Sequence, residues 1–132
     1  MKIAADTNVL VRAMTGDDPR QSRIAQAELA KADEVVLAIP AFCELVWVLS
    51  QGYEIPSAEI AAAIRQLISG ANAVVNRPAV EAGLTQMDGG GDFADGAIAY
   101  EGAWLGAEIF VSFDKKAVKL MEARGESARL LS

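Results

Sequence analysis

Short apolar runs alternate along the chain with longer segments in which apolar residues recur every three or four positions. The run 35–38 is typical of a buried strand, whereas the spacing of Ile60, Ile64 and Ile68 is typical of one face of a helix. By the same criteria we expect helices over residues 9–14, 19–31, 41–51, 58–69, 78–87, 92–105 and 115–122, and strands over residues 2–5, 35–38, 73–75, 109–113 and 128–131. This alternation predicts one α/β domain, residues 1–132, with a parallel sheet flanked by helices.

Proline, glycine and short polar residues mark the ends of several predicted helices. Asp18 is expected to be an N-cap, with Pro19 at the first helical position, where its missing N–H is not needed. Ser57 is expected to cap another helix, and Gly52 and Gly70 are expected to end the helices that they follow.

The cysteine and histidine contents narrow the possible chemistry. The one cysteine, Cys43, lies in an apolar run and is interpreted as a buried hydrophobic residue, so a reducing, cytoplasmic setting is expected. The chain shows no signal peptide and no apolar run of the ~18 residues that a membrane span needs, so we expect a soluble protein without membrane contact. The lack of histidine excludes histidine-based triads and argues against zinc sites.

Two acidic residues directly follow predicted strands. Asp6 ends the first strand, and Asp114 follows the strand 109–113. Because open parallel sheets bind ligands at the carboxyl ends of their strands, both carboxylates are expected at one edge of the sheet. For Asp114 alone, an N-cap of the next helix is an equally good explanation.

Glu44 lies in the helix 41–51, which is apolar on almost every side. Such a helix is usually buried, so Glu44 is expected near the core. A buried carboxylate must be protonated, paired or bound to a cation. No Lys or Arg lies between Lys31 and Arg65, so a metal ion explains Glu44 better than the alternative, a salt bridge to a distant Arg.

Asp92 and Asp95 lie three residues apart at the start of the helix 92–105, and this spacing puts both carboxylates on one face. Asp92 suits an N-cap, and an acid in the first turn suits the helix dipole. Capping does not explain why Asp95 borders the apolar stretch 97–100.

Taken together, these five acids form a set of oxygen ligands that favours Mg²⁺ or Mn²⁺ over zinc or copper. Carboxylates around such ions are what phosphodiester hydrolysis uses. The net charge of −6 disfavours a nucleic-acid partner, but without these five acids it is only −1. A nearby basic cluster is interpreted either as a contact for an RNA backbone or as a solvated helix face: Lys115, Lys116 and Lys119.

At these residues the chain resembles the PIN-domain family, and within it the VapC toxins of bacterial toxin–antitoxin pairs. The resemblance covers essentially the whole chain. It is carried by Asp6-Thr7-Asn8, Glu44, residues 92–99 and Ser112-Phe113-Asp114. Each of these segments alone is a weak signal, but four in this order and at these separations are a strong one.

The resemblance implies a Rossmann-like, three-layer α/β fold and an endoribonuclease that cleaves single-stranded RNA with Mg²⁺ or Mn²⁺. Asp6, Glu44 and Asp95 match the three core metal-binding acids, and Asp114 matches the fourth. Positions that would support these ligands are Thr7, Asn8, Asp92 and Ser112. A homodimer and a cognate VapB-like antitoxin are implied as well.

Some residues depart from the family pattern, and other readings stay open. Lys116 and Ala117 stand where the family often has an acid and an aromatic residue, and Gly96 stands where it usually has alanine. A haloacid-dehalogenase-type phosphatase would need a second Asp at the position of Asn8. A receiver-like module would need an acidic pair at the first strand and a Lys after the last strand, and neither is present in the right place. A non-catalytic PIN-like binding domain is a further alternative.

Overall fold

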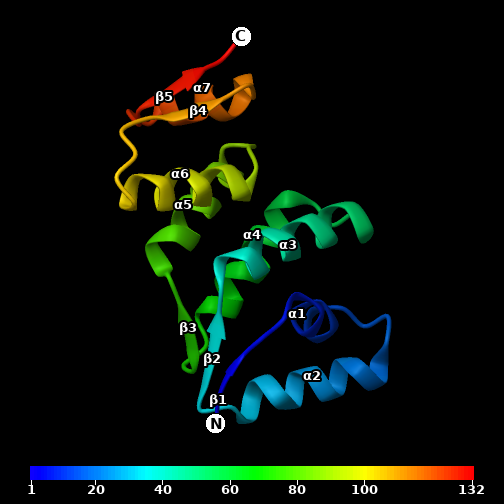
Figure 1. Cartoon of the computed structure of the whole chain (residues 1–132). Coiled ribbons are helices and arrows are strands. Elements are labelled where there is room, and N and C mark those ends of the chain that lie inside the picture. The colour runs from blue at the N-terminus through cyan, green and yellow to red at the C-terminus, as the bar shows by residue number, and fades with distance from the viewer. The chain divides into compact units, whose positions relative to one another are not determined.

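The computed structural model describes residues 1–132, which form two compact units, Met1–Asn76 and Arg77–Ser132. The fold is α/β, with short parallel strands and a larger share of helix (Figure 1). Unit 1 contains β1 (Lys2–Ala4), α1 (Thr7–Met14), α2 (Pro19–Lys31), β2 (Glu34–Leu37), α3 (Ile39–Trp47), the π-helix η1 (Val48–Gly52), α4 (Ser57–Ile68) and β3 (Ala73–Val75). Unit 2 contains α5 (Arg77–Asp88), α6 (Phe93–Trp104), β4 (Phe110–Ser112), α7 (Lys115–Ala123) and β5 (Ala128–Leu130).

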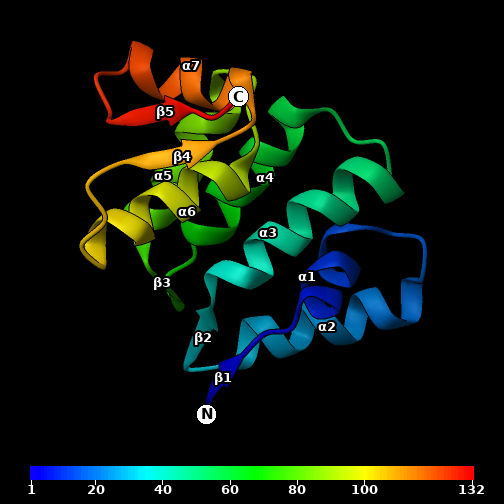
Figure 2. The same ribbon diagram turned by 45° about the horizontal axis from the view of Figure 1, so that its top comes forward.

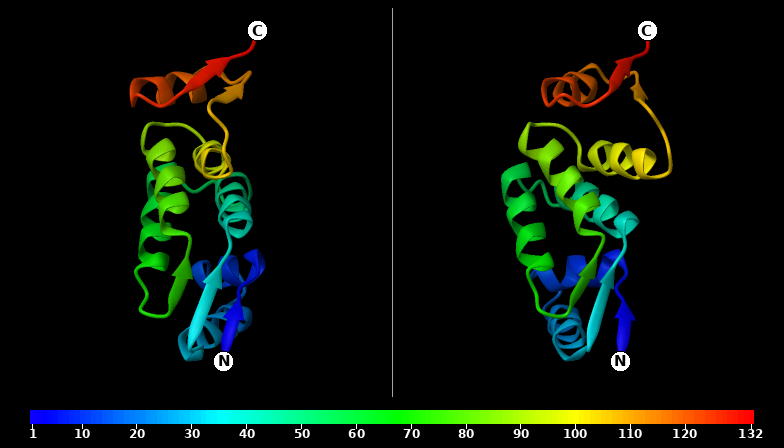
Figure 3. Two further views of the ribbon diagram at one scale, coloured as in Figure 1. Left: turned by 60° about the vertical axis from the view of Figure 1, so that its left-hand side comes forward. Right: turned by 90° about the vertical axis from the view of Figure 1, so that its left-hand side faces the viewer.

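In unit 1, a parallel sheet with the order β1-β2-β3 carries the helices. The three strands lie side by side in Figure 3. Because side chains alternate along β2, Val35 and Leu37 are buried, whereas Val36 is exposed. Helix α4 packs against β3. Helix α1 packs against both α2 and α3, as Figure 2 shows. The most deeply buried large side chains of the unit are Leu10, Phe42, Leu45, Leu49, Ile60 and Ile64.

In unit 2, α5 and α6 pack at very close range because two glycines lie at their contact. A Cβ atom at Gly96 would lie 2.3 Å from the carbonyl oxygen of Ala82, and one at Gly83 would lie 2.5 Å from the ring of Phe93. The glycine that departs from the family pattern at position 96 therefore has a steric reason in this chain.

The rest of unit 2 is a parallel pair of strands, β4 and β5, covered by α7. The buried side chain of Gln86, on α5, connects this part to the helices. Its Nε2 donates to the carbonyl oxygen of Ala117 over 3.3 Å, and its Oε1 accepts from Nη2 of Arg124 over 2.6 Å. The buried amide is thus bonded at both ends, as a buried polar group must be to avoid a desolvation cost.

The predicted order of helices and strands and the parallel pairing are confirmed, and Asp18 caps α2 by accepting from the backbone N–H of Gln21 over 3.1 Å. Within each unit the strands form one small parallel sheet, β1-β2-β3 in unit 1 and β4-β5 in unit 2. One expectation was wrong. Ser57 is the first residue of α4 rather than its cap; the cap is Pro56, whose carbonyl oxygen accepts from Glu59 and Ile60. None of the helices is both long and apolar enough to cross a lipid bilayer.

Candidate active site

Asp6 lies in the turn between β1 and α1, and Thr7 is the first residue of α1. Asp6 is the N-cap of α1, and its Oδ1 accepts from the backbone N–H of Thr7 over 2.8 Å. The Thr7 side chain is only 7% exposed, yet its hydroxyl oxygen has no hydrogen-bond partner. Because an unsatisfied buried hydroxyl is costly, this atom marks a place where a bound water would be stabilising. Asn8, the next residue, is exposed.

Glu44 lies on α3 and is exposed, so the expectation that it lies near the core was wrong. Helix α3 buries one face, formed by Ala41, Phe42 and Leu45. Its opposite side leaves even Trp47 67% exposed. This apolar helix is therefore not buried on all sides, and burial does not require Glu44 to bind a cation.

Two acids of unit 2 act on a third, Asp95. Asp95 is half-buried in the first turn of α6, three residues after the exposed cap Asp92. Burial raises the pKa of the Asp95 carboxyl group above its ordinary value, and the negative charges of Asp92 and Asp114 raise it further. Both effects disfavour the ionised form, and a bound divalent cation would reverse the second of them.

Asp92 and Asp114 are both helix caps. Oδ1 of Asp92 accepts from the N–H of Ala94 over 3.4 Å, and Oδ1 of Asp114 accepts from the N–H of Ala117 over 3.1 Å. The hydroxyl of Ser112 in turn accepts from the N–H of Asp114 over 2.9 Å, which fixes the chain at the end of β4. Like Asp6, each of these caps uses one carboxylate oxygen and leaves the other outside its cap bond.

The basic cluster predicted for RNA lies on the first two turns of α7. Lys115, Lys116 and Lys119 are all exposed, and they follow Asp114 directly in the chain. The ammonium group of Lys116 lies over Gly90, in the glycine-rich loop before α6.

The predicted site residues are divided between the units. Asp6, Thr7, Asn8 and Glu44 belong to unit 1, and Asp92, Asp95, Ser112, Asp114 and the three lysines belong to unit 2. In neither unit do three or more acidic or cysteine side chains gather closely enough to hold a metal ion. The four-ligand set Asp6, Glu44, Asp95 and Asp114 stays a prediction.

The sequence as a whole was compared with known families, and it matches the PIN domain over residues 3–122, a range that spans most of both units. The chain belongs to the PIN domain family. PIN domains are generally nucleases and typically use divalent metal ions. No curated protein matches this PIN domain. Membership favours neither the phosphatase nor the purely binding alternative.

The donor groups of this PIN domain fit a hard divalent cation. The candidate ligands are all carboxylates, with no histidine in the chain, and oxygen is the ligand that Mg²⁺ and Mn²⁺ prefer. The unpartnered hydroxyl of Thr7, next to Asp6, suits a water held by such an ion.

The sequence pattern did not predict the capping role of Asp6, because it places the start of the first helix at residue 9. It also missed a polar cluster in unit 1 around Asp17 and Tyr53, which are 36 residues apart in the chain. The only sequence signal for Asp17 is its place in the turn segment 16–19, and that signal does not indicate which side chain it would hydrogen-bond.

Proposed function

We propose that this PIN domain is a Mg²⁺- or Mn²⁺-dependent endoribonuclease that cleaves single-stranded RNA. The observation that carries the proposal is the placement of acids in a PIN domain: at the end of β1, on α3, in the first turn of α6 and after β4. The proposed metal ligands are Asp6, Glu44, Asp95 and Asp114.

The ion, when bound, would polarise the scissile phosphate and lower the pKa of the attacking water. The chain's own residues would do the rest. The caps of α1 and α7 hold Asp6 and Asp114 in fixed orientations, since one oxygen of each is tied to a backbone N–H. Thr7 would orient a water through its buried hydroxyl, and the exposed lysines of α7 would bind the RNA backbone beside the metal.

We further propose that the chain is the toxin of a type II toxin–antitoxin pair, of the VapC kind. It would then act in the cytoplasm as a homodimer and bind a VapB-like antitoxin. Support for this finer assignment comes from the order and spacing of the four segments that resemble VapC toxins.

Purified protein incubated with a single-stranded RNA oligonucleotide tests the proposal. We expect internal cleavage in the presence of Mg²⁺ or Mn²⁺ and none after addition of EDTA. A small phosphate monoester serves as the control substrate, because a haloacid-dehalogenase-type phosphatase would hydrolyse it and a nuclease would not. Hydrolysis of the monoester without RNA cleavage, or binding of RNA without cleavage, would contradict the proposal.

A further inference from the structure

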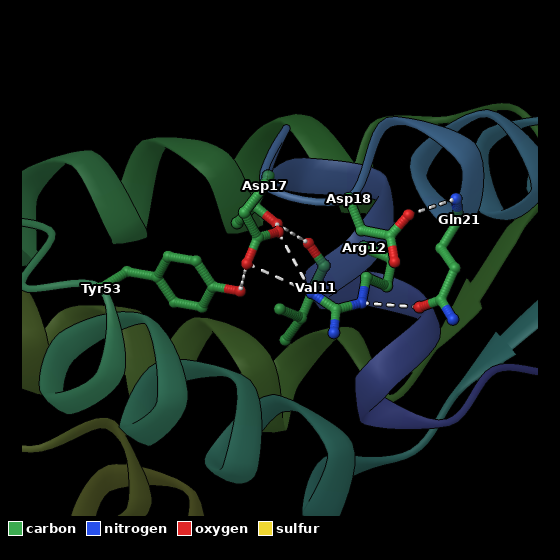
Figure 4. A network of polar contacts seen from close by, with 7 residues as sticks. Val11, Arg12, Asp17, Asp18, Gln21 and Tyr53 are labelled. Carbon is green, nitrogen blue, oxygen red and sulfur yellow. Dashed lines mark hydrogen bonds and ion pairs between the residues drawn. The ribbon is translucent and has the colours of Figure 1, made fainter.

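A polar cluster in unit 1 is centred on the carboxylate of Asp17 (Figure 4). Its Oδ2 accepts from the hydroxyl of Tyr53 over 2.6 Å, and its two oxygens lie 3.1 and 3.2 Å from Nη1 of Arg12. The hydroxyl of Thr15 lies 2.9 Å from Oδ1 of Asp17 and 2.8 Å from the carbonyl oxygen of Val11, so its one hydrogen is shared between them. Arg12 also donates from Nε to the side chain of Gln21 over 2.8 Å.

These contacts keep Asp17 ionised. The hydrogen bonds from Tyr53 and Thr15 lower the pKa of the Asp17 carboxyl group, and the positive charge of Arg12 lowers it further. A hydrogen bond to a charged acceptor is shorter and stronger than one between neutral groups. The Tyr53–Asp17 bond is of this kind.

The cluster joins segments that are far apart in the sequence. Arg12 and Thr15 belong to the last turn and the C-cap of α1, and Asp17 lies in the loop before α2. Tyr53 directly follows η1, which continues α3 without a break. The Tyr53–Asp17 bond therefore ties the end of the α3–η1 helix to the end of α1.

The helix end that Tyr53 holds has irregular backbone geometry. Residues 48–52 form a π-helix, and Glu54 has φ of 54°, in the left-handed region that residues other than glycine rarely adopt. Single π-turns and strained residues persist only where surrounding contacts hold them, and they are frequent near functional sites. Besides the bond to Asp17, the N–H of Ile55 donates to the carbonyl oxygen of Leu49 over 3.0 Å.

The two helices tied in this way each carry one of the proposed metal ligands. Asp6 caps α1, and Glu44 lies on α3, which packs against α1. The Glu44 side chain is exposed, so its position follows from the placement of its helix. A shift of α3–η1 along α1 would change the separation of Asp6 and Glu44.

We propose that Asp17 and Tyr53 are positioning residues, which fix α3–η1 on α1 and thereby set Glu44 relative to Asp6 for metal binding. This inference rests on the proposed function. Neither Asp17 nor Tyr53 is a proposed metal ligand, and both lie at the opposite end of α1 from Asp6.

The test compares Tyr53→Phe and Asp17→Asn with the parent protein, each at its full length. Tyr53→Phe removes only the hydroxyl that donates to Asp17. Tyr100→Phe is the matched control, because it deletes the hydroxyl of the other tyrosine, in unit 2. Asp33→Asn is the control for Asp17→Asn, because Asp33 is an exposed acid of unit 1 whose ion pair is with the chain's N-terminus.

Two measurements are made on each protein. Free Mn²⁺ is followed by electron paramagnetic resonance during a titration, which gives the affinity for metal without RNA. Hydrogen–deuterium exchange of the metal-free protein reports the opening of residues 48–56. We expect Tyr53→Phe to weaken Mn²⁺ binding by up to about tenfold, the lower end of the loss seen when a direct hydrogen bond to a metal ligand is removed, and to speed exchange in that segment. The controls should match the parent in both.

A double variant distinguishes positioning from general loss of stability. If both residues act through one bond, Asp17→Asn combined with Tyr53→Phe should weaken Mn²⁺ binding little more than either change alone. Faster exchange with unchanged Mn²⁺ affinity would overturn the inference, as would equal weakening by Tyr100→Phe. A parent protein that neither binds Mn²⁺ nor cleaves RNA would overturn the proposed function and this inference together.

Discussion

Among single residues, Asp95 shows how placement changes the chemistry of a carboxyl group. Burial and the charges of Asp92 and Asp114 raise its pKa, which means that the folded protein holds this proton more tightly than the unfolded chain does. Below the ordinary value of about 4, the proton is bound in both states and the fold bears no cost. As the pH rises from that value to the raised pKa, the unfolded chain loses this proton before the folded protein does, so the metal-free fold loses stability over that interval.

Asp95→Asn should therefore raise the melting temperature of the metal-free protein by a few degrees at pH 7, and the gain should shrink toward zero as the pH approaches 4. Asp92→Asn should give a smaller gain, because it removes only one of the two neighbouring charges and Asn caps a helix nearly as well as Asp. Thermal melts in EDTA at several pH values measure both. A gain for Asp95→Asn that stayed constant from pH 4 to 7 would show that ionisation of Asp95 is not the cause.

At the scale of elements, the contact between α5 and α6 depends on Gly96. Gly96→Ala should destabilise the fold although alanine favours helices, because the new methyl group would lie 2.3 Å from the carbonyl oxygen of Ala82. Overpacking costs about 1–3 kcal/mol, against a gain of about 1 kcal/mol in helix propensity. We expect a net loss of about 1 kcal/mol in the free energy of unfolding, measured in urea.

Gly102→Ala is the matched control on the same helix. The nearest atom to a Cβ at Gly102 is the Ala107 Cβ at 3.9 Å, an ordinary contact, so the propensity gain should appear as increased stability. If both substitutions were stabilising, the close approach of α5 and α6 would not exist in solution.

The helices were predictable because their signals are local. Asp18 and Pro19 mark the start of α2 within a few residues of sequence, and the structure has the same start. The exposure of Glu44 was not predictable, because it depends on which face of α3 packs, and α3 is apolar on its buried and exposed sides alike. The hydrogen bond between Asp17 and Tyr53 was not predictable either, because no sequence motif around one residue indicates a contact with the other.

For the whole molecule, the predicted acids account for much of the net charge of −6. Their positions were predictable in part: Asp6 and Asp114 follow β1 and β4, and Asp92 and Asp95 begin α6, as expected from sequence. The grouping of these acids into one metal site was not predictable from the sequence pattern, because it depends on contacts between segments that are distant along the chain. That grouping stays a proposal, and mutation of the individual acids tests it.

The most direct test of the account is cleavage of single-stranded RNA in Mn²⁺ by the parent, Asp95→Asn and Asp92→Asn proteins, each shown by circular dichroism to be folded. The two acids lie three residues apart on α6, and only Asp95 is proposed as a metal ligand. We predict that Asp95→Asn lowers the cleavage rate at least ~100-fold, because metal-ion stabilisation supplies several kcal/mol, while Asp92→Asn keeps most of the activity. RNA cleavage by Asp95→Asn at the parent's rate would contradict the assignment of Asp95 as a metal ligand.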